Sequence, residues 1–114
     1  MKDQLYLLRP GFMNGPHGPL YCSDSVGVEG VLSFFPQLRT LLDVHYLEFP
    51  RPRAALVAAL GEEHQSVPVL IVARGRDLKR GVPEPRGAKG ERFFGDGKSI
   101  QEYLALQYDL PVPS

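Results

Sequence analysis

The sequence has little of several features that mark whole classes of proteins. It contains a single cysteine, Cys22, so no internal disulfide can form and a reducing compartment, the cytoplasm, is expected. No apolar run is long enough to span a bilayer, and the start of the chain does not fit a signal peptide. The 13 basic and 13 acidic residues leave no net charge. General binding of nucleic acid and a polybasic membrane anchor both need excess cation, so neither partner is expected.

What the sequence does contain fits one globular α/β domain over residues 1–114. The hydrophobic fraction of 43% and the charged fraction of 23% are ordinary for a soluble protein. Glycine and proline gather in residues 10–20 and 73–91, which predicts two loops. The second loop also carries six basic residues and is expected to be exposed.

Apolar periodicity predicts the elements between these loops. Four strands are expected, at residues 5–8, 44–49, 67–72 and 92–94. Three helices are expected, at residues 23–35, 54–60 and 96–108. Ser23 or Asp24 is the expected N-cap of the first helix, and Asp96 or Ser99 that of the last. The resulting order, β-α-β-α-β-β-α, indicates a mixed four-stranded sheet in an α/β domain.

Three local motifs carry a family resemblance. Cys22 follows the first strand and opens the first helix, Ser66–Leu70 contains Val-Pro-x-Leu, and Asp96–Leu104 reads Asp-Gly-x-Ser-Ile-x-x-Tyr-Leu. This set resembles the thioredoxin-like superfamily, in the variant found in glutaredoxins and glutathione-transferase N-terminal domains. The resemblance implies a three-layer α/β/α domain and a cis peptide before Pro68.

The chain as a whole also resembles a small bacterial thioredoxin-like family of unknown function. The matching segments are Leu8–Gly11, Glu29–Leu32 and Pro50–Arg53. That resemblance names no reaction.

The cysteine motif limits the chemistry that the resemblance implies. Residues 22–25 read Cys-Ser-Asp-Ser, so there is no resolving thiol and dithiol exchange is excluded. Monothiol chemistry remains, in which Cys22 forms a mixed disulfide with glutathione or a protein thiol. At a helix start, the hydroxyl of Ser25 and nearby N–H groups would favour the thiolate, while the charge of Asp24 opposes it. In the alternative interpretation, Cys22 is simply a small hydrophobic residue.

The resemblance also implies contacts to glutathione. The backbone of Val67 would pair with the extended ligand, and Pro68 would face Cys22. Asp96 would accept from an amino group, although Gly97 replaces the serine that the family uses there. Arg53, at the start of the second helix, would hold a carboxylate. Each residue also has a purely structural interpretation, since Pro68 can shape the fold and arginines are commonly solvated.

Two functions from different classes stay open. One is a thiol-dependent redox or glutathione-binding domain centred on Cys22, with glutathione as the only ligand implied. The other is a non-catalytic thioredoxin-like module for protein interaction, for example as a homodimer. His17 and His64 could approach Cys22, but no pair of these residues has recognised metal-ligand spacing, so no metal site is predicted.

Overall fold

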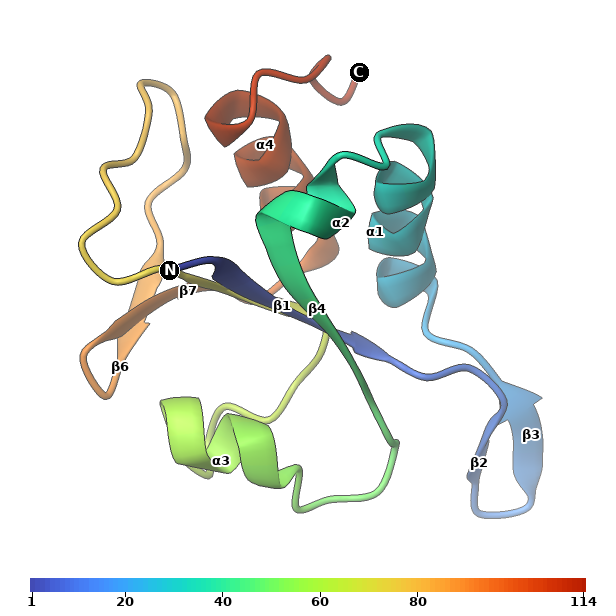
Figure 1. The fold of residues 1–114 in the computed structure, drawn as a ribbon. Coiled ribbons are helices and arrows are strands. Elements are labelled where there is room, and N and C mark those ends of the chain that lie inside the picture. Colours follow the sequence, from blue (N-terminus) through green and yellow to red (C-terminus); the bar gives the residue numbers. More distant parts are fainter.

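A mixed sheet of five strands, in the order β4-β1-β5-β7-β6, lies at the centre of the computed structural model, which describes residues 1–114 (Figure 1). The strands are β1 (Asp3–Leu8), β4 (Leu42–Leu47), β5 (Val69–Val72), β6 (Arg86–Ala88) and β7 (Glu91–Phe94). Strand β1 runs parallel to β4 and antiparallel to β5, and β7 runs antiparallel to both of its neighbours. The mixed α/β sheet is therefore confirmed, but the prediction of four strands is wrong.

Helices cover both faces of this sheet. They are α1 (Ser23–Phe34), α2 (Leu38–Leu41), α3 (Ala54–Leu60) and α4 (Gly97–Gln107). Helices α1, α2 and α4 lie on one face and α3 on the other (Figure 1). None of the four combines the length and the apolar character that a membrane-spanning helix needs.

Two apolar clusters hold the helices to the sheet, because side chains alternate between its faces along each strand. Leu5 and Leu7 of β1 point into a cluster of 12 buried residues that also includes Val28 and Leu32 of α1. Tyr6, between them, points into a cluster of six beneath α3. The larger cluster fixes α1 and α4 and thereby the end of the sheet where both helices begin.

The fifth strand comes from the second predicted loop. Ala88 pairs with Glu91, so only Lys89 and Gly90 connect β6 to β7. Both have positive φ, 51° and 77°, as a tight two-residue hairpin turn requires. Gly90 forms part of this turn, and the prediction of loop alone for residues 73–91 is wrong over its last third.

The first predicted loop also contains a hairpin, formed by β2 (Phe12–Asn14) and β3 (His17–Leu20). Gly15, with φ of 61°, begins its turn. The hairpin projects from the body of the molecule (Figure 1) and is anchored by the ring of Phe12, which stacks on Phe49 at 4.5 Å. Because frequent glycine and proline indicate a loop, the sequence did not predict that β2 and β3 pair.

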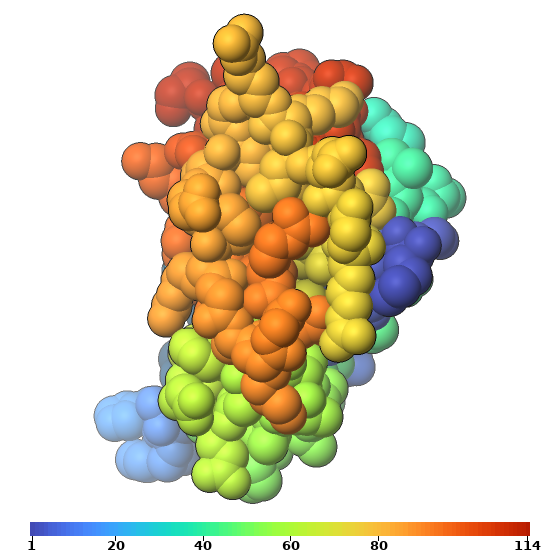
Figure 2. Space-filling model, turned by 90° about the vertical axis from the view of Figure 1, so that its left-hand side faces the viewer, coloured from blue at the N-terminus to red at the C-terminus, as the bar shows by residue number.

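The segment between β5 and β6 is fastened to α4. The backbone N–H of Lys79 donates to Gln107 Oε1 at 2.9 Å, and Gln107 Nε2 donates to the carbonyl of Asp77. With the β6–β7 hairpin, this segment forms one side of the molecule, above α3 (Figure 2). Lys89 Nζ, in the turn of the hairpin, donates to the carbonyl of Ala58 in α3.

Asp3, at the start of β1, is fully buried and is the centre of a polar network. Its carboxylate accepts from Ala73 N at 2.7 Å, from Arg76 Nε at 2.9 Å, from Tyr108 Oη at 2.7 Å and from the hydroxyl of Tyr103. A buried carboxylate is tolerated when it is paired and fully hydrogen-bonded. Asp3 thus joins the first strand to α4 and the segment after β5, a role that the sequence alone does not reveal.

Candidate functional site

The directions of the strands bring the segments that contain Cys22, Pro68 and Asp96 to the same end of the sheet. Tyr6 of β1 lies opposite Val69, and Leu70 lies opposite Phe94 of β7. The carboxyl ends of β1 and β7 therefore flank the amino end of β5. Pro68 lies between these two ends, and both α1 and α4 begin at this edge.

Cys22 is the N-cap of α1 and is half-buried. Its Sγ accepts a hydrogen bond from the backbone N–H of Ser25 at 3.5 Å. The predicted caps, Ser23 and Asp24, lie within the first turn instead, because the helix starts one residue earlier than the side-chain preferences indicated. The sulfur therefore occupies the place that a capping oxygen usually takes.

Ser25 is buried and tethers the start of α1 to the end of β1. Its Oγ accepts from the backbone N–H of Leu8 at 3.0 Å. The contact from Ser25 to Cys22 is made by the backbone N–H and not by the hydroxyl. Donation from the hydroxyl to a thiolate stays a prediction. The structure gives Ser25 a positioning role that spacing did not indicate.

Arg53, the N-cap residue of α3, is only 8% exposed. Its Nη1 donates to the carbonyl of Gln65 at 2.8 Å, and Nη2 donates to that of Phe49 at 2.7 Å. Its Nε has no hydrogen-bond partner, and no carboxylate pairs with the guanidinium. Burial lowers the pKa of Arg53, the charge of Arg51 lowers it further, and a thiolate at Cys22 raises it. Arg53 is thus a fixed internal cation that interacts electrostatically with Cys22.

The Val67–Pro68 peptide is cis, as the resemblance implied. Pro68 is buried and Val67 is half-buried, packed against the cluster beneath α3. Neither the N–H nor the carbonyl of Val67 makes a hydrogen bond within the protein. An unpaired peptide unit of this kind can form hydrogen bonds to an extended ligand.

Asp96 is exposed and caps α4. Its Oδ1 accepts from Ser99 N at 2.8 Å, and its Oδ2 accepts from Ser99 Oγ at 2.9 Å. The next residue, Gly97, packs against the start of α1, where an added Cβ would lie 3.3 Å from both Cβ and Cγ of Asp24. This close approach explains the glycine, since a serine side chain would crowd Asp24.

His17 and His64 lie in different segments of the chain, His17 in β3 and His64 between α3 and β5. His17 is on the exposed β2–β3 hairpin, and the ring of His64 lies at 5.2 Å from that of Phe93. No group of three or more histidine, cysteine, aspartate or glutamate side chains is arranged to hold a metal ion.

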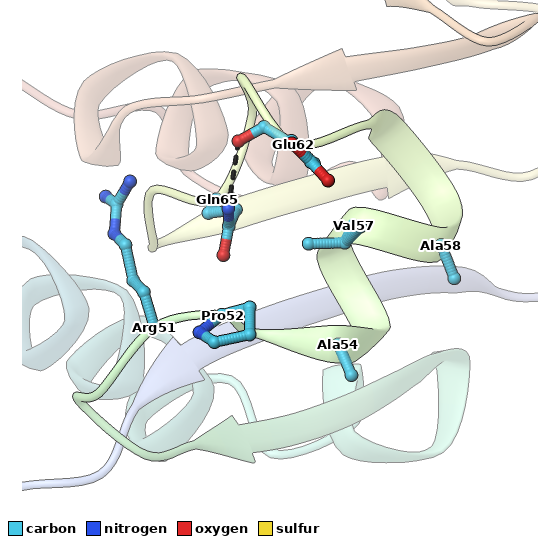
Figure 3. A pocket seen from close by; sticks show the side chains of 7 residues that line it. All are labelled: Arg51, Pro52, Ala54, Val57, Ala58, Glu62 and Gln65. Carbon is cyan, nitrogen blue, oxygen red and sulfur yellow. Dashed lines mark hydrogen bonds between the residues drawn. The ribbon is translucent and has the colours of Figure 1, made fainter.

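A cavity of about 700 Å³ lies on α3 and the segments that flank it (Figure 3). Its lining residues are Arg51, Pro52, Ala54, Val57, Ala58, Glu62 and Gln65. Val57 points into it from the helix, and Gln65 is fixed opposite, where its Nε2 donates to the carbonyl of Glu62. Sequence reasoning missed this cavity; the only signal was the helical spacing of Ala54, Val57 and Ala58.

Comparison with known proteins places the chain in one family. A family model described as "Protein of unknown function (DUF3088)" matches residues 2–112. The chain belongs to this family. Searches found no significant match among curated proteins or among solved structures. This membership supplies no reaction and leaves the resemblance to thioredoxin-like proteins a prediction.

Proposed function

We propose that this member of the DUF3088 family is a thioredoxin-like domain with a monothiol site at Cys22, which forms a mixed disulfide with glutathione. The observation that carries the proposal is the buried guanidinium of Arg53, which lacks a carboxylate partner and lies within electrostatic reach of the Cys22 sulfur. A buried cation without a counter-ion is costly, and a thiolate would supply that counter-ion.

The placement of the motifs supports the thioredoxin-like part of the proposal. Omitting β2, β3, α2 and β6, the elements follow the order β-α-β-α-β-β-α. Cys22 opens the first long helix, and a cis proline lies at the same edge of the sheet. The free peptide unit of Val67 would bind the cysteinyl backbone of glutathione. Asp96 keeps lone pairs available for its amino group, beyond the two contacts to Ser99.

The reaction needs no second protein thiol. The Cys22 thiolate attacks one sulfur of glutathione disulfide, a bond forms between Cys22 Sγ and that sulfur, and one glutathione thiolate leaves. Attack by a glutathione thiolate on the glutathione sulfur of the mixed disulfide reverses this step, releases glutathione disulfide and restores the Cys22 thiolate, so the exchange is reversible and involves no net oxidation or reduction. Both glutathione forms belong to a reducing compartment such as the cytoplasm, where we place the protein.

Intact-protein mass spectrometry after incubation with glutathione disulfide tests the proposal. We expect one glutathione adduct on the wild-type protein, none on Cys22→Ser, and loss of the adduct when reduced glutathione is added. In parallel, the rate of alkylation by iodoacetamide is followed against pH. Arg53→Gln should move the alkylation profile to higher pH, and Arg53→Lys should restore part of the wild-type behaviour. Circular dichroism checks that both variants fold.

Two results would remove the proposal. One is the absence of an adduct at millimolar glutathione disulfide. The other is an alkylation profile that Arg53→Gln leaves unchanged in a folded protein, because the arginine would then have no influence on the thiol.

A non-catalytic interaction module is the second candidate, and one observation favours it. Four exposed apolar side chains surround the cysteine along the chain, namely Met13, Leu20, Tyr21 and Val26. Exposed apolar side chains of this kind suit contact with a protein partner, including a second copy. Sedimentation at rising protein concentration, together with the glutathione test above, separates the two functions.

A further inference from the structure

The cavity on α3 has a volume of about 700 Å³, which lies in the range of small-molecule sites, about 300–1,000 Å³. Its apolar lining comes from Pro52, Ala54, Val57 and Ala58. Small side chains along this helix face leave the space open (Figure 3). The floor therefore suits an apolar group, while the two charged side chains at its border determine which ligand can enter.

Arg51 is the cation at this border and forms no ion pair. Its only hydrogen-bond contact is from Nη2 to Ser66 Oγ, at 3.5 Å. Behind it lies Arg53, which is buried and also lacks a carboxylate. Two neighbouring guanidiniums without an acidic partner repel one another, and an anion at Arg51 would relieve this repulsion.

Glu62 is the anion at the border and is also free of ion pairs. Its backbone carbonyl accepts from Gln65, but its carboxylate makes no hydrogen bond within the protein. Because Gln65 uses both of its side-chain polar atoms within the protein, it presents little new hydrogen-bonding capacity to a ligand. Glu62 therefore opposes a second negative charge on the ligand.

We propose that this cavity binds an apolar monocarboxylate. The carboxylate lies at Arg51, and the hydrocarbon part covers Pro52 and Val57. Glu62 excludes dicarboxylates. The proposal concerns a site outside the Cys22 reaction and does not depend on it, so every measurement is made on the Cys22→Ser protein.

Three eight-carbon probes test charge and shape together. They are octanoate, octylammonium and octanedioate, titrated below their aggregation concentrations and followed by amide chemical shifts in nuclear magnetic resonance. We expect octanoate alone to shift the amides of Val57, Ala58 and Gln65 saturably. Equal binding of all three probes would indicate unspecific apolar contact and would overturn the proposal. Failure of octanoate to bind would do the same.

Matched variants locate the site. Arg51→Gln should weaken octanoate binding about fivefold, the upper range for an exposed ion pair. Arg80→Gln, at an exposed arginine without hydrogen bonds in the structure, is the control and should bind as before. Ala58→Trp fills the cavity from an exposed position and should abolish binding without unfolding the protein. Glu62→Gln should admit octanedioate.

Unchanged octanoate affinity in both Arg51→Gln and Ala58→Trp would place any binding elsewhere and would refute the site. Concentration-dependent dimerisation that Ala58→Trp abolishes, in a protein that binds no octanoate, would identify the face as an interface between copies instead.

Discussion

The hydroxyl of Tyr103 donates a hydrogen bond to the carboxylate of Asp3, across 100 residues of sequence. Both side chains are fully buried. This contact joins α4 to the first strand of the sheet. It is also the point at which the stability of the fold can be tested most directly.

Tyr103→Phe should lower the free energy of unfolding by about 2 kcal/mol, since a buried carboxylate would lose one of its donors while the ring stays in place. Urea denaturation at pH 7 measures the loss. Tyr21→Phe is the control, because Tyr21 is 63% exposed and its hydroxyl has no partner, so its change should stay within about 0.5 kcal/mol. Equal effects of the two substitutions would contradict the role given to Asp3.

Alkaline pH should destabilise the protein. Burial, followed by the hydrogen bond to Asp3, raises the pKa of both Tyr103 and Tyr108 above the ordinary value of 10.0. The unfolded chain therefore loses these two protons near pH 10 while the native protein keeps them. Their contribution is fully present below pH 10 and declines as the pH rises above it.

The expected slope above pH 10 is at most about 1.4 kcal/mol per pH unit for each tyrosine. Denaturation series between pH 8 and pH 11 measure it. In Tyr108→Phe the slope should become smaller, because one of the two groups no longer titrates. A stability that stays level up to pH 11 is incompatible with this assignment.

The capping role of Cys22 predicts different effects for two small substitutions. Cys22→Ser should leave the free energy of unfolding unchanged or slightly higher, because a serine oxygen is a better acceptor for the N–H of Ser25. Cys22→Ala removes the acceptor and should cost about 0.5–1 kcal/mol. Thermal denaturation of the two variants compares them. A loss above about 1 kcal/mol in Cys22→Ser would instead mean that the thiol belongs to the core.

Ser25→Ala should lower the free energy of unfolding more than either substitution of Cys22. The expected loss is about 1–3 kcal/mol, because the buried N–H of Leu8 would lose its acceptor. Ser33→Ala, at an exposed position of the same helix, is the matched control and should change stability little. If the two variants unfold at the same denaturant concentration, the hydrogen bond from Leu8 to Ser25 does not contribute to the stability of the fold.

Local patterns were enough to predict the main strands and helices. Leu5–Leu8 and Val69–Val72 are continuous apolar runs, and the last helix has a clear cap in Asp96. The hairpin turn at Lys89 and Gly90 was missed because glycine in a charged segment indicates a loop as readily as a turn. The strand β6 forms only by pairing with β7, and the residues of β6 alone give no sign of this partner.

The candidate site was predictable only in outline. The position of Cys22 and the cis peptide before Pro68 followed from short motifs. The hydrogen bond from Leu8 to Ser25 and the burial of Arg53 depend on contacts between segments distant in sequence. No spacing rule describes such contacts, so the sequence does not reveal that backbone carbonyls hold Arg53 inside the protein, and a contact from Arg53 to a ligand stays a prediction.

The network at Asp3 also has a consequence for biosynthesis. Its donors lie at residues 73, 76, 103 and 108, and β1 lies between β4 and β5 in the sheet. Strand β1 therefore cannot complete its contacts until Tyr108, the residue after α4, has emerged from the ribosome. A nascent chain in which Tyr108 is still inside the ribosome should therefore stay sensitive to protease, and it should become resistant once Tyr108 has emerged.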